Sequence, residues 1–486
     1  MRLGDLMRGW GGAEADAALA VTGITADSRA VRPGMVFAAL PGARADGRAF
    51  IADAVARGAS AILAPEGTAW PVEAPLRPLV TSPDPRRALA LMAAAFFGAQ
   101  PECVVAITGT NGKTSSVDFL RQIWRSAGRK AASLGTLGLI AEGIPPGPSL
   151  TTPDPVALHE NLAQLARNGV AALAMEASSH GIDQRRLDGV ALAAAGFTNL
   201  TRDHLDYHGN MAAYRAAKLR LFDTLLPAGA PAIAMADTEA ETLTALREIA
   251  AKRRLDLRLV GVGGDALTLE VARPLPEGQE ITFRMAGARY EILLPLPGRF
   301  QADNALMAAM LAMATGVAEQ SAMAALAHLQ GVRGRMERAA VLPNGAAIYV
   351  DYAHTPDALT RLLAALRPHV AGRLHVLFGA GGDRDPGKRP LMGRAAAEAS
   401  DRVWITDDNP RSENPAAIRA AVLTGCPEAI DAGARKEAIA KAMSVLGPGD
   451  VLAVAGKGHE TGQEIAGIVH PFDDVAVIRK LAGHMP

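Results

Sequence analysis

The stretch Ile107–Thr114 reads ITGTNGKT, and it decides the fold expected for the middle of this chain. It completes the apolar run Cys103–Thr108, which is expected to form a strand buried on both faces. It then enters a helix that carries Val117, Leu120 and Ile123 on one side. Glycines between a strand and a helix let backbone N–H groups turn toward an anion. The pattern predicts a phosphate-binding loop.

Two side chains of this loop have expected roles in nucleotide binding. Lys113 would neutralise the outer phosphates, and the hydroxyl of Thr114 would ligate Mg²⁺. The match departs from the standard pattern at Ile107, where a glycine is usual. Because kinases, transport ATPases, ligases and nucleotide-gated binding proteins all use such loops, the rest of the chain must discriminate among them.

Two further residues follow predicted strands and could join a metal site. Glu176 ends the apolar run Ala171–Glu176, where a carboxylate is costly unless it meets a cation. His204 lies in the polar segment Asn199–Gly209, directly after another predicted strand. A Mg²⁺ held by Thr114 and Glu176, with a second cation near His204, is chemically reasonable. Each residue alone is more often structural at such a position.

Composition bounds the class of protein. Hydrophobic residues make up 49% of the 486 residues and charged residues 21%, as is typical of a globular protein. Lysine plus arginine equals aspartate plus glutamate at 50 each, so net charge favours neither nucleic acid nor an anionic membrane as a partner. Two cysteines exclude a disulfide scaffold, and we expect a cytoplasmic protein without a membrane span.

The chain is too long for one hydrophobic core, and we expect three domains with α/β folds. A proline-dense stretch marks one boundary, so residues 1–85 form a small N-terminal domain and residues 86–332 a central one. Residues 333–486 form the last domain. Within the first domain we expect strands at Met35–Leu40 and Ser60–Ala64 and a helix at Arg48–Arg57.

The other two domains alternate apolar runs with helical stretches, which is typical of parallel sheets. Alternating apolar residues around Gly287 predict one antiparallel hairpin late in the central domain. In the last domain, strands are expected at Ala346–Val350, Leu374–Phe378, Arg402–Thr406 and Val451–Ala455. Ligands of such sheets bind beyond the carboxyl ends of the strands, where polar and glycine-rich residues follow here.

Several segments together resemble the Mur ligase family. They are the phosphate loop, Asn199–Gly209, Gly298–Asn304 and Asp351–His354. Further segments resemble the member that adds the third amino acid of the peptide: Asp27–Arg29, Thr151–Pro153, Glu176–Gly181, Gly381–Asp385, Asp408–Arg411 and Gly456–Glu460. The resemblance covers essentially the whole chain. It implies a central P-loop ATPase domain with a parallel sheet, a Rossmann-like C-terminal domain and a small α/β N-terminal domain.

The resemblance also implies roles for individual residues. The catalytic set would be Lys113, Lys218, His204 and Glu176. ATP would contact Gly109, Thr110, Asn111, Gly112, Lys113, Thr114, Ser115, Asn304, Arg335 and Asp351. UDP-MurNAc-L-Ala-D-Glu would contact Ser28, Ala43, Arg44, Ala45, Thr151, Thr152, Ser178, Gln184 and Arg186. Lys218 would be carried as a carbamate and would ligate Mg²⁺ with Thr114, Glu176 and His204.

The third amino acid implied by the resemblance is meso-diaminopimelate, because an arginine follows Asp408-Asn409-Pro410. A guanidinium forks onto the second carboxylate that distinguishes this amino acid from lysine. Arg411 and Arg384 would form that clamp, and Asp408, Asn409, Pro410, Gly456 and Glu460 would complete the pocket. Glu460 would pair with the distal ammonium.

The implied activity is an ATP-dependent amide ligation through an acyl phosphate in peptidoglycan precursor synthesis, with ATP as co-substrate and Mg²⁺ as cofactor. The expected partners are UDP-MurNAc-L-Ala-D-Glu, meso-diaminopimelate and ATP, and the expected state is a monomer. Two alternatives stay open. A folylpolyglutamate-type ligase would share the ATP chemistry but has no evident use for the domain around Asp27–Arg29. A non-catalytic nucleotide-gated protein would not need Glu176, His204 and Lys218.

Overall fold

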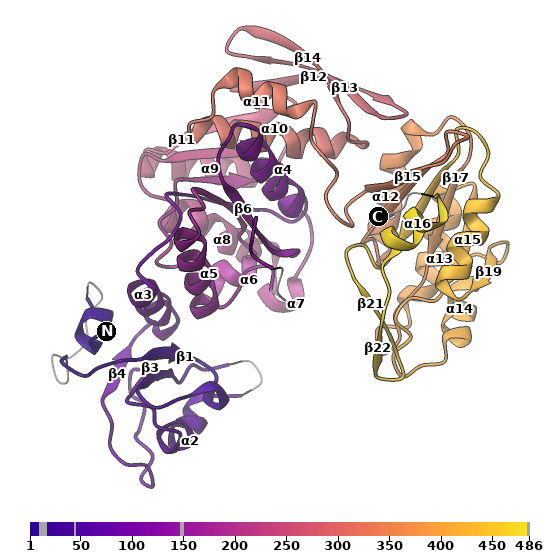
Figure 1. Ribbon diagram of the computed structural model, residues 1–486. Helices are drawn as coiled ribbons and strands as arrows, with labels where there is room; N and C mark the ends of the chain where they lie inside the picture. Colours follow the sequence, from indigo (N-terminus) through magenta and orange to yellow (C-terminus); the bar gives the residue numbers. More distant parts are fainter. Residues whose placement is uncertain (9–16, 43–44, 146–149, 484–486) are drawn as a thin grey trace. The chain divides into compact units, whose positions relative to one another are not determined.

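The structure is a computed structural model that describes residues 1–8, 17–42, 45–145 and 150–483 (Figure 1). The described chain divides into two compact units. The first comprises Met1–Asp265 with Met307–Ala322, and the second comprises Ala266–Leu306 with Met323–Pro486. The first unit therefore contains the segment expected as the N-terminal domain and most of the one expected as the central domain.

A four-stranded parallel sheet in the order β1-β2-β3-β4 forms the beginning of the first unit. Its strands are Gly23–Thr25, Met35–Ala38, Ala61–Pro65 and Leu79–Ser82, accompanied by α1 (Leu3–Leu6), η1 (Ser28–Ala30), η2 (Gly47–Phe50) and α2 (Ile51–Ala56). The two expected strands are confirmed. The expected helix Arg48–Arg57 begins instead as a tight 3₁₀ turn, because the Asp46 side chain accepts a hydrogen bond from the Arg48 N–H and caps that turn.

Helix α3 (Pro85–Phe97) follows, and its ends have clear causes in the sequence. Asp84 caps the first turn by accepting from the Arg87 N–H, and Pro85 takes the first helical position. Gly98 ends the helix at φ +68°. The buried face, which includes Leu89 and Met92, packs into the core shared with the four-stranded sheet.

The main sheet of the first unit has the strand order β11-β10-β9-β5-β8-β6-β7. All pairs are parallel except β6 with β7. The strands are β5 (Cys103–Thr108), β6 (Ala131–Gly135), β7 (Gly138–Ile140), β8 (Ala172–Glu176), β9 (Ala194–Phe197), β10 (Pro231–Met235) and β11 (Asp256–Gly261). The helices are α4 (Lys113–Ser126), α5 (Pro155–Arg167), α6 (Ser179–Asp183), α7 (Leu205–His208), α8 (Met211–Arg220), the π-helix η3 (Leu221–Leu225) and α9 (Ala240–Arg253).

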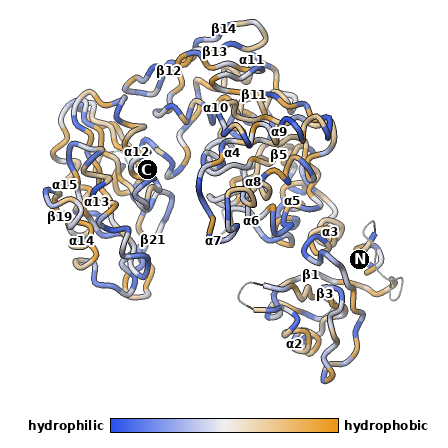
Figure 2. The backbone as a smooth tube through the Cα atoms, turned by 180° about the vertical axis from the view of Figure 1, so that it is seen from behind, coloured by the Kyte–Doolittle hydropathy of each residue, from blue (hydrophilic) through white to orange (hydrophobic). Residues whose placement is uncertain are grey.

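Strand β5 belongs to the main sheet of this unit (Figure 2), where it pairs with β8 on one side and β9 on the other. All six of its residues are buried, as are those of β8 and β9. Because the three strands are parallel, their carboxyl ends lie side by side at one edge of the sheet. The polar segments that follow β5, β8 and β9 therefore meet there.

The second unit begins with an antiparallel meander of β12 (Leu267–Leu275), β13 (Gly278–Met285) and β14 (Ala288–Leu294). The expected hairpin is confirmed as β13 and β14, with Phe283 stacked on Tyr290. Strand β12 was not predicted, because its outer half (Glu270, Val271 and beyond) lacks a buried face. Helices α10 (Arg299–Ala314) and α11 (Glu319–Leu326) come next in the chain, and the residues Met307–Ala322 of this stretch belong to the first unit.

A six-stranded sheet in the order β15-β16-β20-β17-β18-β19 makes up the rest of the second unit. The strands are β15 (Glu337–Val341), β16 (Ala347–Asp351), β17 (Leu374–Phe378), β18 (Arg402–Thr406), β19 (Ile430–Gly433) and β20 (Val451–Ala455), with a separate hairpin of β21 (Gly462–Ile465) and β22 (Ile468–Pro471). The helices are α12 (Pro356–Leu366), η4 (Arg367–His369), α13 (Lys388–Ala399), α14 (Pro415–Leu423), α15 (Arg435–Ser444) and α16 (Asp474–Leu481).

The core of this sheet follows the period of two of a strand. In β20, Val451, Ala453 and Ala455 join one hydrophobic cluster, whereas Leu452 and Val454 join another. The sheet is therefore covered on both faces, as expected for a Rossmann-like arrangement, and only the edge strand β15 is antiparallel to its neighbour. The α/β fold class is confirmed. Within the described residues, no helix is long and apolar enough to cross a membrane.

Candidate active site

The loop between β5 and α4 has the backbone that its glycines predict. Gly109 lies at φ +140° and Gly112 at φ +85°, and Lys113 is the first residue of α4. A Cβ atom at Gly109 would come within 1.8 Å of the Thr198 hydroxyl oxygen. Only glycine fits this close approach. The loop thus presents N–H groups at a helix N-terminus, as an anion site requires.

The segment after β9 holds the loop in place. The Thr110 N–H donates to the Asn199 carbonyl oxygen at 2.8 Å, and the Asn111 N–H donates to the Asn199 side-chain oxygen at 3.0 Å. The Thr198 hydroxyl donates to the Asn111 carbonyl oxygen at 2.6 Å. The segment Asn199–Gly209 was expected at the site, but no role was predicted for Thr198 or for Asn199 itself. Their role depends on β5 and β9 being neighbours.

Two lysines converge on the same loop carbonyl. The Lys113 ammonium donates to the carbonyl oxygens of Gly109 and Thr110 at 2.9 and 2.8 Å. The Lys218 Nζ donates to the Gly109 oxygen at 2.7 Å. Lys218 is 1% exposed, so it is not a solvated surface lysine. The structure therefore brings together Lys218 and Lys113, as the resemblance implied.

Burial strongly perturbs Lys218. Loss of hydration, reinforced by the positive charge of Lys113, lowers the pKa of Lys218 from 10.5 to about 6. Its Nζ lies 4.5 Å from the centre of the Tyr214 ring, and the Tyr214 hydroxyl contacts the Thr110 hydroxyl at 3.2 Å. Tyr214 was missed from sequence. Its position four residues before Lys218 on α8 was the available signal, because such residues share a helix face.

Glu176 ends β8 next to β5, and it is 1% exposed. Its carboxylate accepts from the Thr136 N–H at 2.8 Å and from the Thr136 hydroxyl at 3.3 Å. Gly135 leaves the room that this carboxylate occupies, since a Cβ atom there would lie 2.2 Å from it. Glu176 is therefore near the loop but is held by Thr136 in this ligand-free structure.

His204 lies near the same loop, because its ring packs against aromatic residues beside that loop. It has φ +51° and precedes α7, and its ring centre is 6.2 Å from that of Tyr214 and 4.9 Å from that of His180. Its Nε2 lies 3.5 Å from the Asp203 carboxylate. Lys113, Lys218, Glu176 and His204 thus lie around one end of the sheet, and the predicted catalytic set is spatially consistent.

The residues expected to hold the peptide part of the nucleotide substrate form one connected network. The Thr152 hydroxyl donates to the Glu176 carbonyl oxygen and accepts from the Ser178 N–H. The Thr152 carbonyl oxygen accepts from Arg186 at 2.6 Å. Arg186 in turn donates to the side-chain oxygen of Gln184 at 2.7 Å, and the Thr151 hydroxyl contacts that of Thr136 at 3.2 Å.

The residues expected at the uridine end belong to the four-stranded sheet of the first unit. Ser28 begins the short helix η1, which Asp27 caps. Ala45 accepts from the Gly42 N–H at 3.1 Å in a tight loop, and the Arg86 side chain donates to the Pro41 carbonyl oxygen beside it. Ala43 and Arg44, also expected here, lie outside the described residues.

Three predicted ATP contacts lie in the second unit. The Asn304 amide donates to the Gln301 side-chain oxygen at 3.3 Å, and the Gln301 amide donates to the Arg335 carbonyl oxygen at 3.5 Å. The Arg335 guanidinium stacks 5.1 Å over the Tyr352 ring, and its Nε has no hydrogen-bond partner within the described part of the chain. That nitrogen is buried.

Asp351 is the third of these residues and ends β16. Its two carboxylate oxygens accept from the N–H groups of Met336 and Ala353, both at 2.8 Å. Burial raises the pKa of Asp351, and Arg335 opposes that rise. Arg335, Tyr352 and Asp351 therefore lie together.

The pocket expected for the third amino acid assembles after β18 and β20. The Asn409 amide nitrogen donates to the Glu460 carboxylate at 3.0 Å, and the Lys457 ammonium donates to the Asn409 side-chain oxygen and to Glu460, both at 3.1 Å. Lys457 is fully buried. It was not predicted, although a lysine between two glycines after a buried strand was a usable signal. Glu460, expected to meet a ligand ammonium, already pairs with this lysine.

The next contacts involve Asp408 and Gly456. Asp408 is buried, and a Cβ atom at Gly456 would lie 2.6 Å from its carboxylate, so the glycine admits that side chain. Burial raises the pKa of Asp408, against the opposing charges of Arg435 and Lys457. Asp408, Asn409, Gly456 and Glu460 are therefore neighbours, as expected.

Arg411 and Arg384, the two arginines expected to clamp the distal carboxylate, also lie at the end of the six-stranded sheet. Arg411 lies at φ +52°, and its guanidinium donates to the Gly382 carbonyl oxygen at 2.6 Å and lies 3.3 Å from the Glu464 carboxylate. A Cβ atom at Gly381 would meet Arg411 at 2.9 Å and Arg384 at 3.8 Å. Both arginines thus flank one glycine turn, and Pro410 directly precedes Arg411.

A Mg²⁺ site is only partly evident in these side chains. Among the described residues, no group of three or more His, Cys, Asp or Glu side chains could hold a metal ion. Thr114 and Glu176 alone would leave most of an oxygen coordination shell to phosphate, water or a modified residue. A carbamate on Lys218 would add a carboxylate at the loop. Thr114, Glu176 and Lys218 therefore fit a Mg²⁺ ion if Lys218 carries the carbamate.

Comparison with known proteins decides the family. The model of the Mur ligase middle domain matches residues 107–312, that of the Mur ligase glutamate ligase domain residues 334–458, and that of the Mur ligase family catalytic domain residues 20–97. A relative from Caulobacter vibrioides, named UDP-N-acetylmuramoyl-L-alanyl-D-glutamate–2,6-diaminopimelate ligase, is 54% identical over 94% of each chain. The chain belongs to the Mur ligase family.

Other relatives of this Mur ligase agree. A protein of the same name from Bradyrhizobium diazoefficiens is 51% identical over 98% of this chain and 97% of its own. A solved structure of a ligase of that name has a TM-score of 0.72 at 32% identity and covers 95% of both chains. Folylpolyglutamate synthase from Mycobacterium tuberculosis has a TM-score of 0.62 at 19% identity over 82% of this chain, which shows a shared fold.

Proposed function

We propose that this Mur ligase uses ATP to join meso-diaminopimelate to UDP-MurNAc-L-Ala-D-Glu in peptidoglycan precursor synthesis. One observation carries the proposal: Lys218, buried with a pKa of about 6, shares the Gly109 carbonyl oxygen with Lys113 on the phosphate loop. A buried lysine beside a second, half-buried lysine is costly, and hydrophobic side chains would serve packing better. We propose that the two lysines serve instead to bind phosphate and carboxylate groups.

ATP is the co-substrate, and the loop is its phosphate site. The Lys113 ammonium donates to two loop carbonyl oxygens, and it would turn from them to the outer phosphates when ATP binds. Together with the N-terminus of α4 it would offset the charge that develops on the transferred phosphoryl group. Mg²⁺, when bound, would add Lewis-acid stabilisation of that charge, with Thr114, Glu176, His204 and modified Lys218 as its protein ligands. Asn304, Arg335 and Asp351 are the further proposed ATP contacts.

Lys218 is proposed to carry a carbamate. At neutral pH the pKa of about 6 leaves its amine mostly neutral, and a neutral amine has the lone pair that attacks CO₂. The Nζ–C bond forms, one C=O bond of CO₂ opens to an oxyanion, and the amine proton leaves to water. The product is a carboxylate next to the Lys113 ammonium, which stabilises its negative charge.

The ligation itself takes two steps. The side-chain carboxylate of the D-glutamyl residue attacks the γ-phosphorus of ATP, so that an O–P bond forms and ADP leaves. An amine of diaminopimelate then attacks the acyl carbon, the C–O bond to phosphate breaks, and the amine loses a proton. The network of Thr152, Ser178 and Arg186 is the proposed holder of the muramoyl-dipeptide, and Ser28 with residues 43–45 is the proposed holder of the uridine end.

We propose that residues at the end of the six-stranded sheet select diaminopimelate. Arg411 and Arg384 are proposed to bind its distal carboxylate, and Glu460 with Asp408 its distal ammonium. The guanidinium of Arg411 is held by a carbonyl oxygen on one side and the Glu464 carboxylate on the other, which leaves its orientation defined before the ligand arrives. Such a charge-assisted contact discriminates by about 1.5–3 kcal/mol.

Three functional segments follow from these assignments: residues 1–85 for the uridine nucleotide, 86–332 for ATP and 333–486 for the amino acid. We also propose that the enzyme is a monomer. Sedimentation equilibrium that gives about twice the chain mass of 50.4 kDa would reject that state.

The deciding experiment measures phosphate release from ATP with UDP-MurNAc-L-Ala-D-Glu, in parallel with diaminopimelate, lysine, glutamate and no amino acid. We expect turnover with diaminopimelate and little with the other three. Lys113→Ala should lose ADP formation by a factor of about 10² or more while keeping the wild-type circular dichroism spectrum. Turnover with a folate and glutamate would instead support the folylpolyglutamate alternative, and nucleotide binding without turnover would support the binding-protein alternative.

A further inference from the structure

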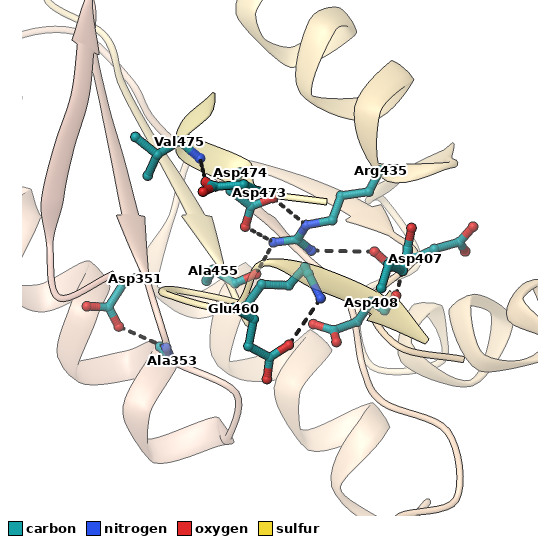
Figure 3. Close-up of polar contacts among 12 residues, drawn as sticks. Asp351, Ala353, Asp407, Asp408, Arg435, Ala455, Glu460, Asp473, Asp474 and Val475 are labelled. Atoms are coloured by element: carbon teal, nitrogen blue, oxygen red, sulfur yellow. Dashed lines mark hydrogen bonds and ion pairs between the residues drawn. The ribbon is translucent and has the colours of Figure 1, made fainter. Parts of the chain in front are cut away.

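A fully buried ion pair joins Arg435 and Asp474 in the second unit (Figure 3). The Arg435 Nε donates to one carboxylate oxygen of Asp474 at 2.8 Å, and one terminal nitrogen donates to the other at 2.7 Å. Both side chains are 0% exposed. The two residues begin different helices, α15 and α16, so the pair also fixes these helix ends to each other.

The same guanidinium binds the ends of two strands. It donates to the carbonyl oxygen of Ala455, the last residue of β20, at 2.9 Å. It also contacts the carbonyl oxygen of Asp407, the residue after β18, at 3.4 Å. Since β20 and β18 lie on either side of β17, one side chain spans three strands at the carboxyl edge of the sheet.

This arrangement is not explained by stability alone. A cation at the first position of a helix opposes the helix dipole, and Arg435 occupies that position in α15. Buried ion pairs can often be replaced by hydrophobic residues without loss of stability. The five donors of arginine in a rigid fork instead suit a role in which several acceptors must be held at set distances.

The two strand ends held by Arg435 carry the charged groups of the amino-acid site. Asp408 and Asn409 follow β18, whereas Lys457 and Glu460 follow β20. The hydrogen bonds that join the two loops run between Asn409, Lys457 and Glu460 at 3.0–3.1 Å. A shift of either strand end would therefore break the contacts that orient these groups.

Arg435 also acts on Asp408 electrostatically. Burial raises the pKa of Asp408, and the charge of Arg435 is the largest influence that opposes the rise, followed by Lys457. Glu460 acts in the other direction. Lys388 and Tyr352 also interact with this carboxylate. Arg435 thus favours the ionised form of Asp408, which an ammonium ligand needs.

We infer that Arg435, held by Asp474, is a positioning residue for the amino-acid site, because its guanidinium sets the spacing of the loops after β18 and β20. The inference rests on the proposed function, since it takes the ligand of these loops to be diaminopimelate. Arg435 itself contacts neither reacting group nor substrate. It acts through Asp408 and the carbonyl oxygens of Asp407 and Ala455.

The test compares Arg435→Met and Arg435→Lys with the wild-type enzyme in steady-state assays from pH 6 to 9. Arg435→Met should raise the KM for diaminopimelate by about tenfold or more, the loss expected for one charge-assisted contact, with the KM values for ATP and the nucleotide substrate within about twofold. The acid limb of the pH profile should move to higher pH, because Asp408 loses the charge that favours its ionised form.

Arg435→Lys separates geometry from charge. It keeps the cation but loses the fork, so we expect a raised KM for diaminopimelate with an acid limb close to that of the wild type. Asp450→Asn serves as the matched control. Asp450 is a buried carboxylate at the opposite end of β20, where it accepts from the Arg373 and Gly447 N–H groups. This control should lower the melting temperature without changing the KM for diaminopimelate.

The outcomes are distinct. A wild-type enzyme that does not use diaminopimelate rejects the proposed function before any variant is compared. If the wild type uses it and a folded Arg435→Met variant has an unchanged KM and acid limb, the positioning role alone is overturned. Should Arg435→Met fail to fold, Arg435→Lys decides: a wild-type KM for diaminopimelate overturns the inference, and a raised KM with an unmoved acid limb supports it.

Discussion

The Nζ of Lys218 lies 2.7 Å from the carbonyl oxygen of Gly109, although the two residues are 109 positions apart in the chain. Lys113 donates to the same oxygen from the other side. One glycine carbonyl oxygen thus accepts from two lysines, of which Lys218 is buried and Lys113 is half-buried. Burial removes the hydration of Lys218, and the positive charge of Lys113 adds to the effect, so the amine of Lys218 is mostly neutral at pH 7.

The first prediction concerns the stability of the Lys218→Met variant in CO₂-free buffer. Folding lowers the pKa of Lys218 from 10.5 to about 6, so between these values the unfolded chain binds more protons than the native one. Native stability therefore rises with pH across that window. The variant lacks this penalty and should be more stable at pH 7, by a margin on the order of 2–4 kcal/mol.

Urea unfolding at pH 7 and pH 9 measures this effect, and the gain should shrink at pH 9. Lys252→Met is the control, because Lys252 is 74% exposed and pairs weakly with Asp223. Equal stability of Lys218→Met and wild type at both pH values would contradict a buried neutral amine.

The second prediction concerns the activity of the same variant. Lys218→Met cannot form a carbamate, so ligation should fall by a factor of about 10² or more. Added short carboxylates such as acetate should restore part of it, because they supply the missing oxygen ligand in the space left by the side chain. Mass spectrometry of the wild type in bicarbonate should show an adduct of one CO₂ on Lys218. Full activity of the variant would exclude the carbamate.

The third prediction tests the close approach at the loop. Gly109→Ala places a Cβ atom within 1.8 Å of the Thr198 hydroxyl, at a φ of +140° that alanine rarely adopts. We expect a loss of about 2–4 kcal/mol in unfolding free energy or a displaced loop with a KM for ATP raised at least about tenfold. Gly128→Ala, also at positive φ but with open space around it, should cost only about 1 kcal/mol. Equal effects of the two substitutions would show that the contact with Thr198 is unimportant.

The fourth prediction concerns Arg411. Arg411→Ala removes the guanidinium beside Gly382 and should raise the KM for diaminopimelate by about 10–100-fold, with little change for ATP. Competition assays should then show less preference for diaminopimelate over lysine. The exposed Arg394 of α13 is the control, and its alanine variant should behave as wild type. An unchanged preference in Arg411→Ala would reject the clamp.

A fifth prediction distinguishes the two roles of Tyr214. Tyr214→Phe keeps the ring beside Lys218 but loses the hydroxyl contact with Thr110, so it should cost about 1 kcal/mol and leave the CO₂ adduct in place. Tyr214→Ala also opens the site to water, which raises the pKa of Lys218 and should reduce adduct formation at pH 7. Similar adduct levels in both variants would contradict a desolvating role for the ring.

Local patterns predicted the elements well. Strands Cys103–Thr108, Leu374–Phe378, Arg402–Thr406 and Val451–Ala455 have the expected bounds, because buried strands in parallel sheets are short, continuous apolar runs that end at polar or glycine residues. Helix α3 was also predictable from its caps. Strand β12 was not, since its exposed outer half follows no period that the sequence reveals.

The groups of the candidate site were predictable only in part. Lys113, Lys218 and the Asp408–Arg411 segment belong to recognisable motifs, and their neighbours in space were expected from the resemblance. Tyr214, Lys457 and Arg435 were missed, although the spacing of Tyr214 from Lys218 and the glycines around Lys457 were local signals. Each owes its role to strands or helices that pack together from distant parts of the chain.

The sequence by itself determined the phosphate loop, the α/β fold and the family, since backbone turns at glycine and apolar periodicity depend on near neighbours. Only the tertiary structure decided that Lys218 is a buried amine with a lowered pKa and that Arg435 holds two strand ends. Hydration and charge depend on what surrounds a side chain, and those surroundings come from segments that only folding brings together.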